Sequence, residues 1–153
     1  MEKSVTIHLP YSNSQLYSVL SDPEFVLPRL FPPIKEVEVT GDSFNAYGRF
    51  MGMRFHIYGI LNKGEQITYK IYLTAGTGKG EGKLVIRVAD SQVELRFEYE
   101  GWMERFSGIL FMDRWFDQFV KRLKEEGVFQ KAIERSVMVR TVIVAKIRFP
   151  FFL

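Results

Sequence analysis

The sequence contains no cysteine and only two histidines among its 153 residues. The lack of cysteine excludes disulfides, thiolate metal ligands and cysteine nucleophiles within this chain. The two imidazoles, His8 and His56, lie on different predicted strands, and neither has a second metal ligand in range along the sequence. We therefore expect no metal site and no cofactor.

The sequence also lacks long hydrophobic runs and a broad excess of positive charge. No stretch of about 18 uncharged apolar residues could span a bilayer, and residues 1–10 lack the apolar core of a signal peptide. These absences predict a cytoplasmic protein with no transmembrane segment. The net charge is +3, but the basic excess lies after residue 126, so residues 1–126 sum to −1 and give no support for a nucleic-acid partner.

Aromatic and aliphatic residues are plentiful, at 15% aromatic and 46% hydrophobic, with 14 phenylalanines. The longest helical pattern runs from Trp102 to Glu126, and its first half is apolar on almost every side. A surface helix needs only one apolar stripe. We therefore expect this long helix to be enclosed by other elements.

Shorter elements precede the long helix. A strand is predicted over residues 4–9, and Ser12 with Gln15 then forms a capping box that opens a short helix. Asp22-Pro23 starts a second helix, which Pro28 is expected to interrupt. Period-two patterns then predict strands over residues 34–40, 44–51, 53–61, 66–74, 82–89 and 92–99. The breaks between them are short enough to permit hairpins only, so the sheet is expected to be an antiparallel meander.

This order of elements resembles the helix-grip fold of the START, Bet v 1-like and polyketide-cyclase-like proteins (SRPBCC). The local resemblance lies in Leu20 to Glu24, leading through Pro32-Pro33 to Val39, and the similarity covers residues 3–126. It implies an α+β fold in which a curved antiparallel sheet of about seven strands wraps around a long C-terminal helix, with two short helices after strand one. It also implies a cavity for hydrophobic molecules, but it brings no catalytic motif.

We expect the cavity lining to come from inward strand positions, from the second short helix and from the long helix. The predicted ligand-binding residues are Phe25, Leu30, Phe50, Phe55, Ile57, Tyr69, Ile71, Phe97, Tyr99, Arg105, Phe106, Ile109, Leu110 and Asp113. A core completely packed by these side chains is the alternative, because protein interiors are normally close-packed.

Two charged residues, Arg105 and Asp113, project onto the enclosed side of the long helix. Buried charges are costly unless they are paired. Each is interpreted either as part of an internal ion pair or as a contact for the polar head of a ligand. Arg105 is the favoured anchor for a carboxylate, because a guanidinium can hold both oxygens.

Two further features have a structural and a functional interpretation. The glycine-rich segment from Gly76 to Gly82 lacks the spacing of a phosphate loop, so we expect a hairpin loop near the cavity mouth. His56 is interpreted as a hydrogen-bonded residue of the sheet, with a catalytic base as the alternative.

The leading functional hypothesis is non-catalytic binding, transport or sensing of a hydrophobic small molecule, with a fatty acid as the favoured example. A cyclase- or aromatase-like enzyme is the first alternative, and Asp113, His56 and Tyr69 are its candidate acids and bases. The second alternative is a protein-interaction or co-chaperone-like module.

Residues 127–153 form a basic, apolar extension beyond the predicted ligand-binding domain of residues 1–126. Exposed apolar segments are usually covered. The extension is therefore expected to pack on the same domain or on a partner, including a second copy of the chain. Contact with an anionic membrane is the alternative.

Overall fold

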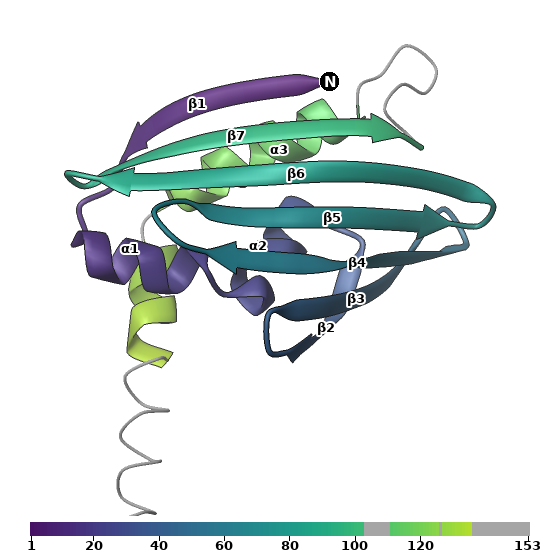
Figure 1. The fold of residues 1–153 in the computed structure, drawn as a ribbon, viewed down its shortest axis with the longest axis horizontal. Coiled ribbons are helices and arrows are strands. Elements are labelled where there is room, and N and C mark those ends of the chain that lie inside the picture. The colour runs from purple at the N-terminus through teal and green to yellow at the C-terminus, as the bar shows by residue number, and fades with distance from the viewer. Residues whose placement is uncertain (103–110, 126, 136–153) are drawn as a thin grey trace, which may run out of the picture.

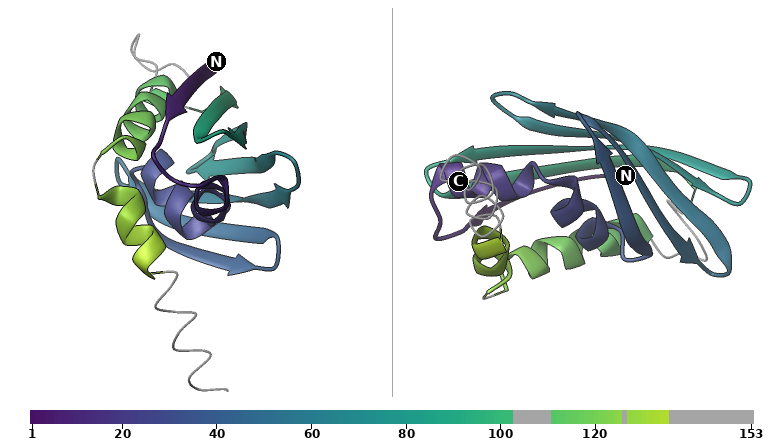
Figure 2. Two further views of the ribbon diagram at one scale, coloured as in Figure 1. Left: turned by 90° about the vertical axis from the view of Figure 1, so that its left-hand side faces the viewer. Right: turned by 90° about the horizontal axis from the view of Figure 1, so that it is seen from below.

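The structure is a computed structural model that describes residues 1–102, 111–125 and 127–135. It is an α+β fold in which helices cover one face of a curved antiparallel sheet (Figures 1 and 2). The seven strands are β1 (Glu2–His8), β2 (Ile34–Thr40), β3 (Ser43–Phe50), β4 (Met53–Lys63), β5 (Ile67–Ala75), β6 (Gly78–Ala89) and β7 (Gln92–Gly101). Their order in the open sheet is β1-β7-β6-β5-β4-β3-β2, which confirms the antiparallel meander.

The two predicted short helices are α1 (Asn13–Leu20) and α2 (Pro23–Leu30). The capping box of α1 is present, since the Gln15 amide donates to Ser12 Oγ and the Ser12 amide donates to Gln15 Oε1, both at 3.1 Å. The expectation that Pro28 interrupts α2 is wrong, because the helix continues through it. Pro28 has no amide proton to donate to the Glu24 carbonyl, and Glu24 is exposed to solvent.

The predicted long helix is not confirmed: within the predicted range 102–126, the described residues form only the shorter helix α3 (Phe111–Leu123). Its predicted start at Trp102 is wrong: this residue lies in a turn after β7, where its amide donates to the Lys79 carbonyl at 2.8 Å. The part of the prediction that covers residues 103–110 lies outside the described residues. A further helical segment, residues 128–135, follows α3.

The glycine-rich segment is a strand and not the hairpin loop that its composition predicts. β6 begins at Gly78, and the turn from β5 comprises only Gly76 and Thr77. Turn composition was misleading here because glycine also serves in strands where other groups approach the backbone closely.

The helices among the described residues lie on the inner face of the sheet (Figure 2). Buried side chains alternate along β3 to β7 and face these helices, whereas the outer face is exposed or half-buried. At one end of the sheet β3 turns into β4, β5 turns into β6, and β7 ends; this end is on the right in Figure 1, and we call it the distal end.

Candidate ligand-binding site

A cluster of aromatic rings lies between the inner face of the sheet and α3 toward the distal end. This aromatic cluster consists of Phe31, Phe50, Phe55, Phe97, Trp102, Phe111, Trp115 and Phe116. Trp115 connects its parts, with its ring centroid 6.3 Å from Phe31, 6.1 Å from Phe55 and 5.4 Å from Phe50. Most of these pairs meet edge to face, which is a favourable geometry for aromatic side chains.

The burial of the cluster decreases toward the distal end. Phe31, Phe55 and Phe97 are fully buried, whereas Phe50, Trp102 and Phe111 are half-buried. The half-buried rings contact one another, because Phe50 lies 5.9 Å from both Trp102 and Phe111. The cluster therefore has a closed inner part and a partly accessible edge.

Alternate glycines on the inner face of β6 make room for two rings. A Cβ atom at Gly78 would lie 2.0 Å from the Trp102 ring, and one at Gly80 would lie 2.0 Å from the Tyr99 hydroxyl. That hydroxyl donates to the Trp102 carbonyl at 2.5 Å. The glycines therefore let Tyr99 and Trp102 lie directly against the strand, which sets the position of Trp102 in the cluster.

The structure brings only some of the predicted ligand-binding residues into this cluster. Phe50, Phe55 and Phe97 belong to it. Leu30, Ile57, Ile71 and Tyr99 are buried in the same core. Phe25 instead packs against Phe129, at 5.5 Å between ring centroids, and beneath the Arg29 guanidinium.

The predicted residues Arg105, Phe106, Ile109 and Leu110 lie outside the described residues. The predicted ligand-binding residues do not include five members of the cluster, which are Phe31, Trp102, Phe111, Trp115 and Phe116. Phe31 follows α2 immediately before a pair of prolines, and no periodic pattern assigns a residue in such a position to the core.

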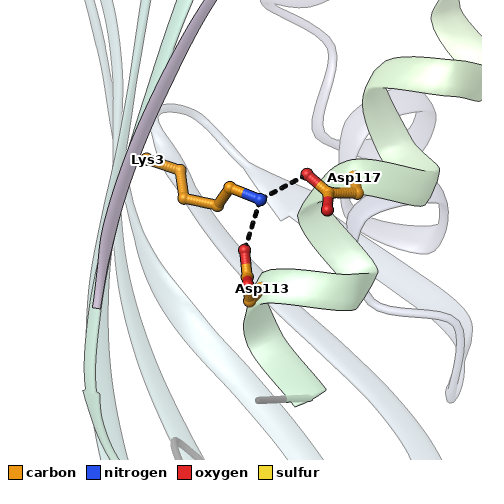
Figure 3. A network of polar contacts seen from close by, with 3 residues as sticks. All are labelled: Lys3, Asp113 and Asp117. Carbon is orange, nitrogen blue, oxygen red and sulfur yellow. Dashed lines mark hydrogen bonds and ion pairs between the residues drawn. The ribbon is translucent and has the colours of Figure 1, made fainter.

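Asp113 forms an ion pair on the β1 side of α3 (Figure 3). Lys3 points inward from β1 and places Nζ 2.5 Å from Asp113 Oδ1 and 2.6 Å from Asp117 Oδ1. Hydrogen bonding to Asp113, and then to Asp117, raises the pKa of Lys3. Asp113, which was predicted on the enclosed side of the helix, thus takes part in a structural contact between α3 and β1.

Tyr69 and His56 are also held by polar partners. The Tyr69 hydroxyl donates to the Leu20 carbonyl at 2.7 Å, and burial raises the pKa of this tyrosine. His56 lies on the outer face of the sheet, with Nε2 3.0 Å from Asn45 Oδ1 and its ring stacked on Tyr47, and partial burial lowers its pKa. This agrees with the interpretation of His56 as a hydrogen-bonded sheet residue.

The described part of the chain offers neither a metal site nor a membrane-spanning helix. Within residues 1–102, 111–125 and 127–135, no group of three or more histidine, cysteine, aspartate or glutamate residues could hold a metal ion. In the same ranges no helix is both long and apolar enough to cross a membrane.

Comparisons with known proteins identify the fold and the family. A family model described as "-like" matches residues 1–138, and no curated protein matches the chain. A hypothetical protein from Sulfolobus tokodaii is similar in structure, with a TM-score of 0.63 and 22% identity over 88% of this chain and 98% of that one. A conserved protein from Geobacillus kaustophilus gives a TM-score of 0.60 and 16% identity over 89% and 97% of the two chains.

A START superfamily protein from Mycobacterium smegmatis has the same fold, with a TM-score of 0.56 and 13% identity over 88% of this chain and 97% of that one. The structural similarity extends over nearly the whole length of each of these proteins. The chain therefore belongs to the family whose model matches residues 1–138, and it has the fold of a START superfamily protein.

Proposed function

We propose that this protein binds a hydrophobic small molecule between the inner face of the sheet and α3, and that a fatty acid represents the ligand class. The observation that supports this proposal is the aromatic cluster with its half-buried edge of Phe50, Trp102 and Phe111. An apolar ligand would enter at this edge and replace water on the exposed parts of the three rings. Such a carrier or sensor needs no covalent chemistry.

An alkyl chain would bind mainly through the hydrophobic effect. Each buried methylene contributes about 0.8 kcal/mol, which is about a fourfold gain in affinity. The polar head would remain near the distal end, where the cluster is accessible. Arg105 stays our proposed anchor for a carboxylate head, because its fork of donors matches the two oxygens.

The experiment that tests this proposal is native mass spectrometry of the full chain with saturated fatty acids of increasing length. We expect one-to-one complexes whose affinity rises about fourfold per methylene until the site is filled. Absence of binding for every chain length would refute the proposal. For the head group, Arg105→Gln should weaken fatty acids much more than the corresponding alcohols, and an equal loss for both would remove Arg105 as the anchor.

Two phenylalanines on β3 provide a matched pair of variants. Phe50 lies in the half-buried edge of the cluster, whereas Phe44 is buried against Tyr69, with 5.9 Å between ring centroids. Phe50→Leu should weaken ligand binding severalfold with a small loss of stability. Phe44→Leu should lower the free energy of unfolding more and leave ligand affinity unchanged, because the ring lies outside the cluster.

The enzyme interpretation receives less support from the described residues. A cyclase or aromatase needs an acid or base beside its substrate. Asp113 is paired with Lys3, Tyr69 donates to a backbone carbonyl, and His56 faces the outer side of the sheet. None of these three groups belongs to the aromatic cluster, so we favour binding without catalysis.

A further inference from the structure

The β3–β4 hairpin ends in an apolar tip between two arginines. We call residues 49–54 the hairpin tip; its sequence is Arg-Phe-Met-Gly-Met-Arg. Phe50 pairs with Met53, so the loop consists of Met51 and Gly52 alone. Both loop residues have positive φ angles, 53° and 78°, as a type I′ hairpin turn requires.

Met51 is unfavourable at this position for two reasons, which are its backbone conformation and the exposure of its apolar side chain to water. Asparagine or glycine is preferred at a position with positive φ, because a longer side chain is strained there. Met51 is nevertheless 63% exposed, the highest value among the exposed large hydrophobic residues of the described chain. An apolar side chain in this position is stabilised when the tip meets an apolar phase.

The two arginines beside Met51 are also unfavourable without a partner. Arg49 and Arg54 are exposed and lie directly opposite each other on β3 and β4, where like charges repel. In the described part of the chain neither guanidinium has a carboxylate within ion-pair distance. Both line a surface groove of about 690 Å³ together with Tyr47, Met53, His56 and Thr74.

We propose that the hairpin tip docks on the surface of an anionic membrane. Met51 enters the boundary between head groups and acyl chains, and Arg49 and Arg54 bind lipid phosphates on either side of it. An arginine fork matches phosphate oxygens, and an anionic leaflet attracts each basic residue near its surface. The membrane thus supplies the apolar phase and the counter-charge that the tip lacks in water.

Docking at this point would place the candidate ligand site beside the bilayer. Phe50 belongs both to the hairpin tip and to the aromatic cluster, where it contacts Trp102, Phe111 and Trp115. A hydrophobic ligand could then pass between the bilayer and the cluster without crossing bulk water. The passage of a ligand between the bilayer and the cluster rests on the proposed function. The docking itself rests only on the residues of the hairpin tip.

Vesicle sedimentation of the full chain tests the docking. We expect binding to vesicles of equal parts phosphatidylcholine and phosphatidylserine, and much weaker binding to phosphatidylcholine alone. Arg49→Gln with Arg54→Gln should weaken binding about thirtyfold, at about fivefold per basic residue. Met51→Asn should weaken binding about tenfold while the protein becomes as stable as the wild type or more so, because asparagine suits the positive φ.

Lys70→Gln with Lys83→Gln is the matched control, because these lysines form a second directly opposed pair on the same face, away from the tip. Its vesicle affinity should stay within about twofold of the wild type. Equal losses for the lysine and arginine pairs, unchanged binding of the tip variants, or no binding by the wild type would each overturn the proposal. Fatty-acid affinity measured without vesicles should be unchanged in Met51→Asn, so failure of ligand binding and failure of docking are distinguishable.

Discussion

Single residues decide how closely the aromatic rings approach the sheet. Gly80 is the sharpest case, since an added Cβ would lie 2.0 Å from the hydroxyl of the buried Tyr99. Gly80→Ala should therefore lower the free energy of unfolding by about 1–3 kcal/mol, as overpacking of a core does. Urea denaturation provides the measurement.

Gly64→Ala is the control for this substitution, because the nearest atom to its added Cβ would be 3.9 Å away. It should change the free energy of unfolding by less than about 0.5 kcal/mol. If the two alanine variants were equally stable, this would contradict the close packing of Tyr99 against Gly80 of β6.

Alternation in the sequence predicts which face of a strand a residue occupies, and Phe55 and Phe97 are inward as predicted. It does not predict which inward residues meet. The partner of Asp113 illustrates this, because Lys3 lies on an edge strand at the other end of the chain. Helical projection assigned Asp113 to the enclosed side, but only the pairing of β1 with β7 shows why a charge is tolerated there.

At the scale of elements, the contact of Lys3 with Asp113 and Asp117 fastens β1 to α3. Lys3→Met should cost about 1 kcal/mol of stability, because two carboxylates one turn apart are then left to repel each other. Arg87→Met is the control, since its ion pair with Glu94 is longer, at 3.9 Å, and exposed. Its loss should be near zero.

The Lys3 contact also predicts a pH dependence. The pKa of Lys3 is raised in the folded state, so the unfolded chain loses this proton first as the pH increases. The stability difference between the wild type and Lys3→Met should therefore be constant from neutral pH up to the ordinary lysine pKa of 10.5 and should fall as the pH rises through the folded-state pKa. If the stability difference persisted at pH values above the folded-state pKa, the stability lost in Lys3→Met would come from packing and not from the ion pair.

The strands were predictable as elements because period-two patterns and short turns leave few alternatives. β6 was shortened in the prediction because its first residues alternate glycine with charge, which also describes a loop. The role of Gly78 and Gly80 depends on rings of Tyr99 and Trp102 that follow about twenty residues later. The composition of residues 76–82 alone could therefore not show that these glycines lie in a strand beneath two aromatic rings.

At the scale of the whole molecule, the C-terminal extension begins inside the core. Phe129 is 1% exposed and lies 5.4 Å from the Tyr11 ring and 5.5 Å from the Phe25 ring, measured between centroids. The segment 128–135 therefore packs against α2; the sequence analysis assigned residues 127–153 to an extension that packs on the same domain or on a partner. A domain limit drawn from charge and composition could not detect this contact.

Two truncated chains distinguish the contribution of the packed segment 128–135 from that of residues 137–153. A chain ending at residue 126 loses Phe129 and should be less stable by about 3–5 kcal/mol, the usual effect of removing a buried phenylalanine. A chain ending at residue 136 keeps every core residue found in the described ranges and should unfold with nearly the wild-type midpoint. Thermal unfolding measures both, and native mass spectrometry gives their oligomeric states.

The chain ending at residue 136 also tests two of the interpretations of residues 137–153. If these residues join subunits, the chain ending at residue 136 should be a monomer where the full chain is a dimer, with the fatty-acid affinity retained. If they complete the core of the same domain, this chain should unfold at a clearly lower temperature and bind ligand less tightly, because the aromatic cluster is then no longer held against the sheet. We expect no clear loss of stability, because Phe129 already closes the core beside Tyr11 and Phe25.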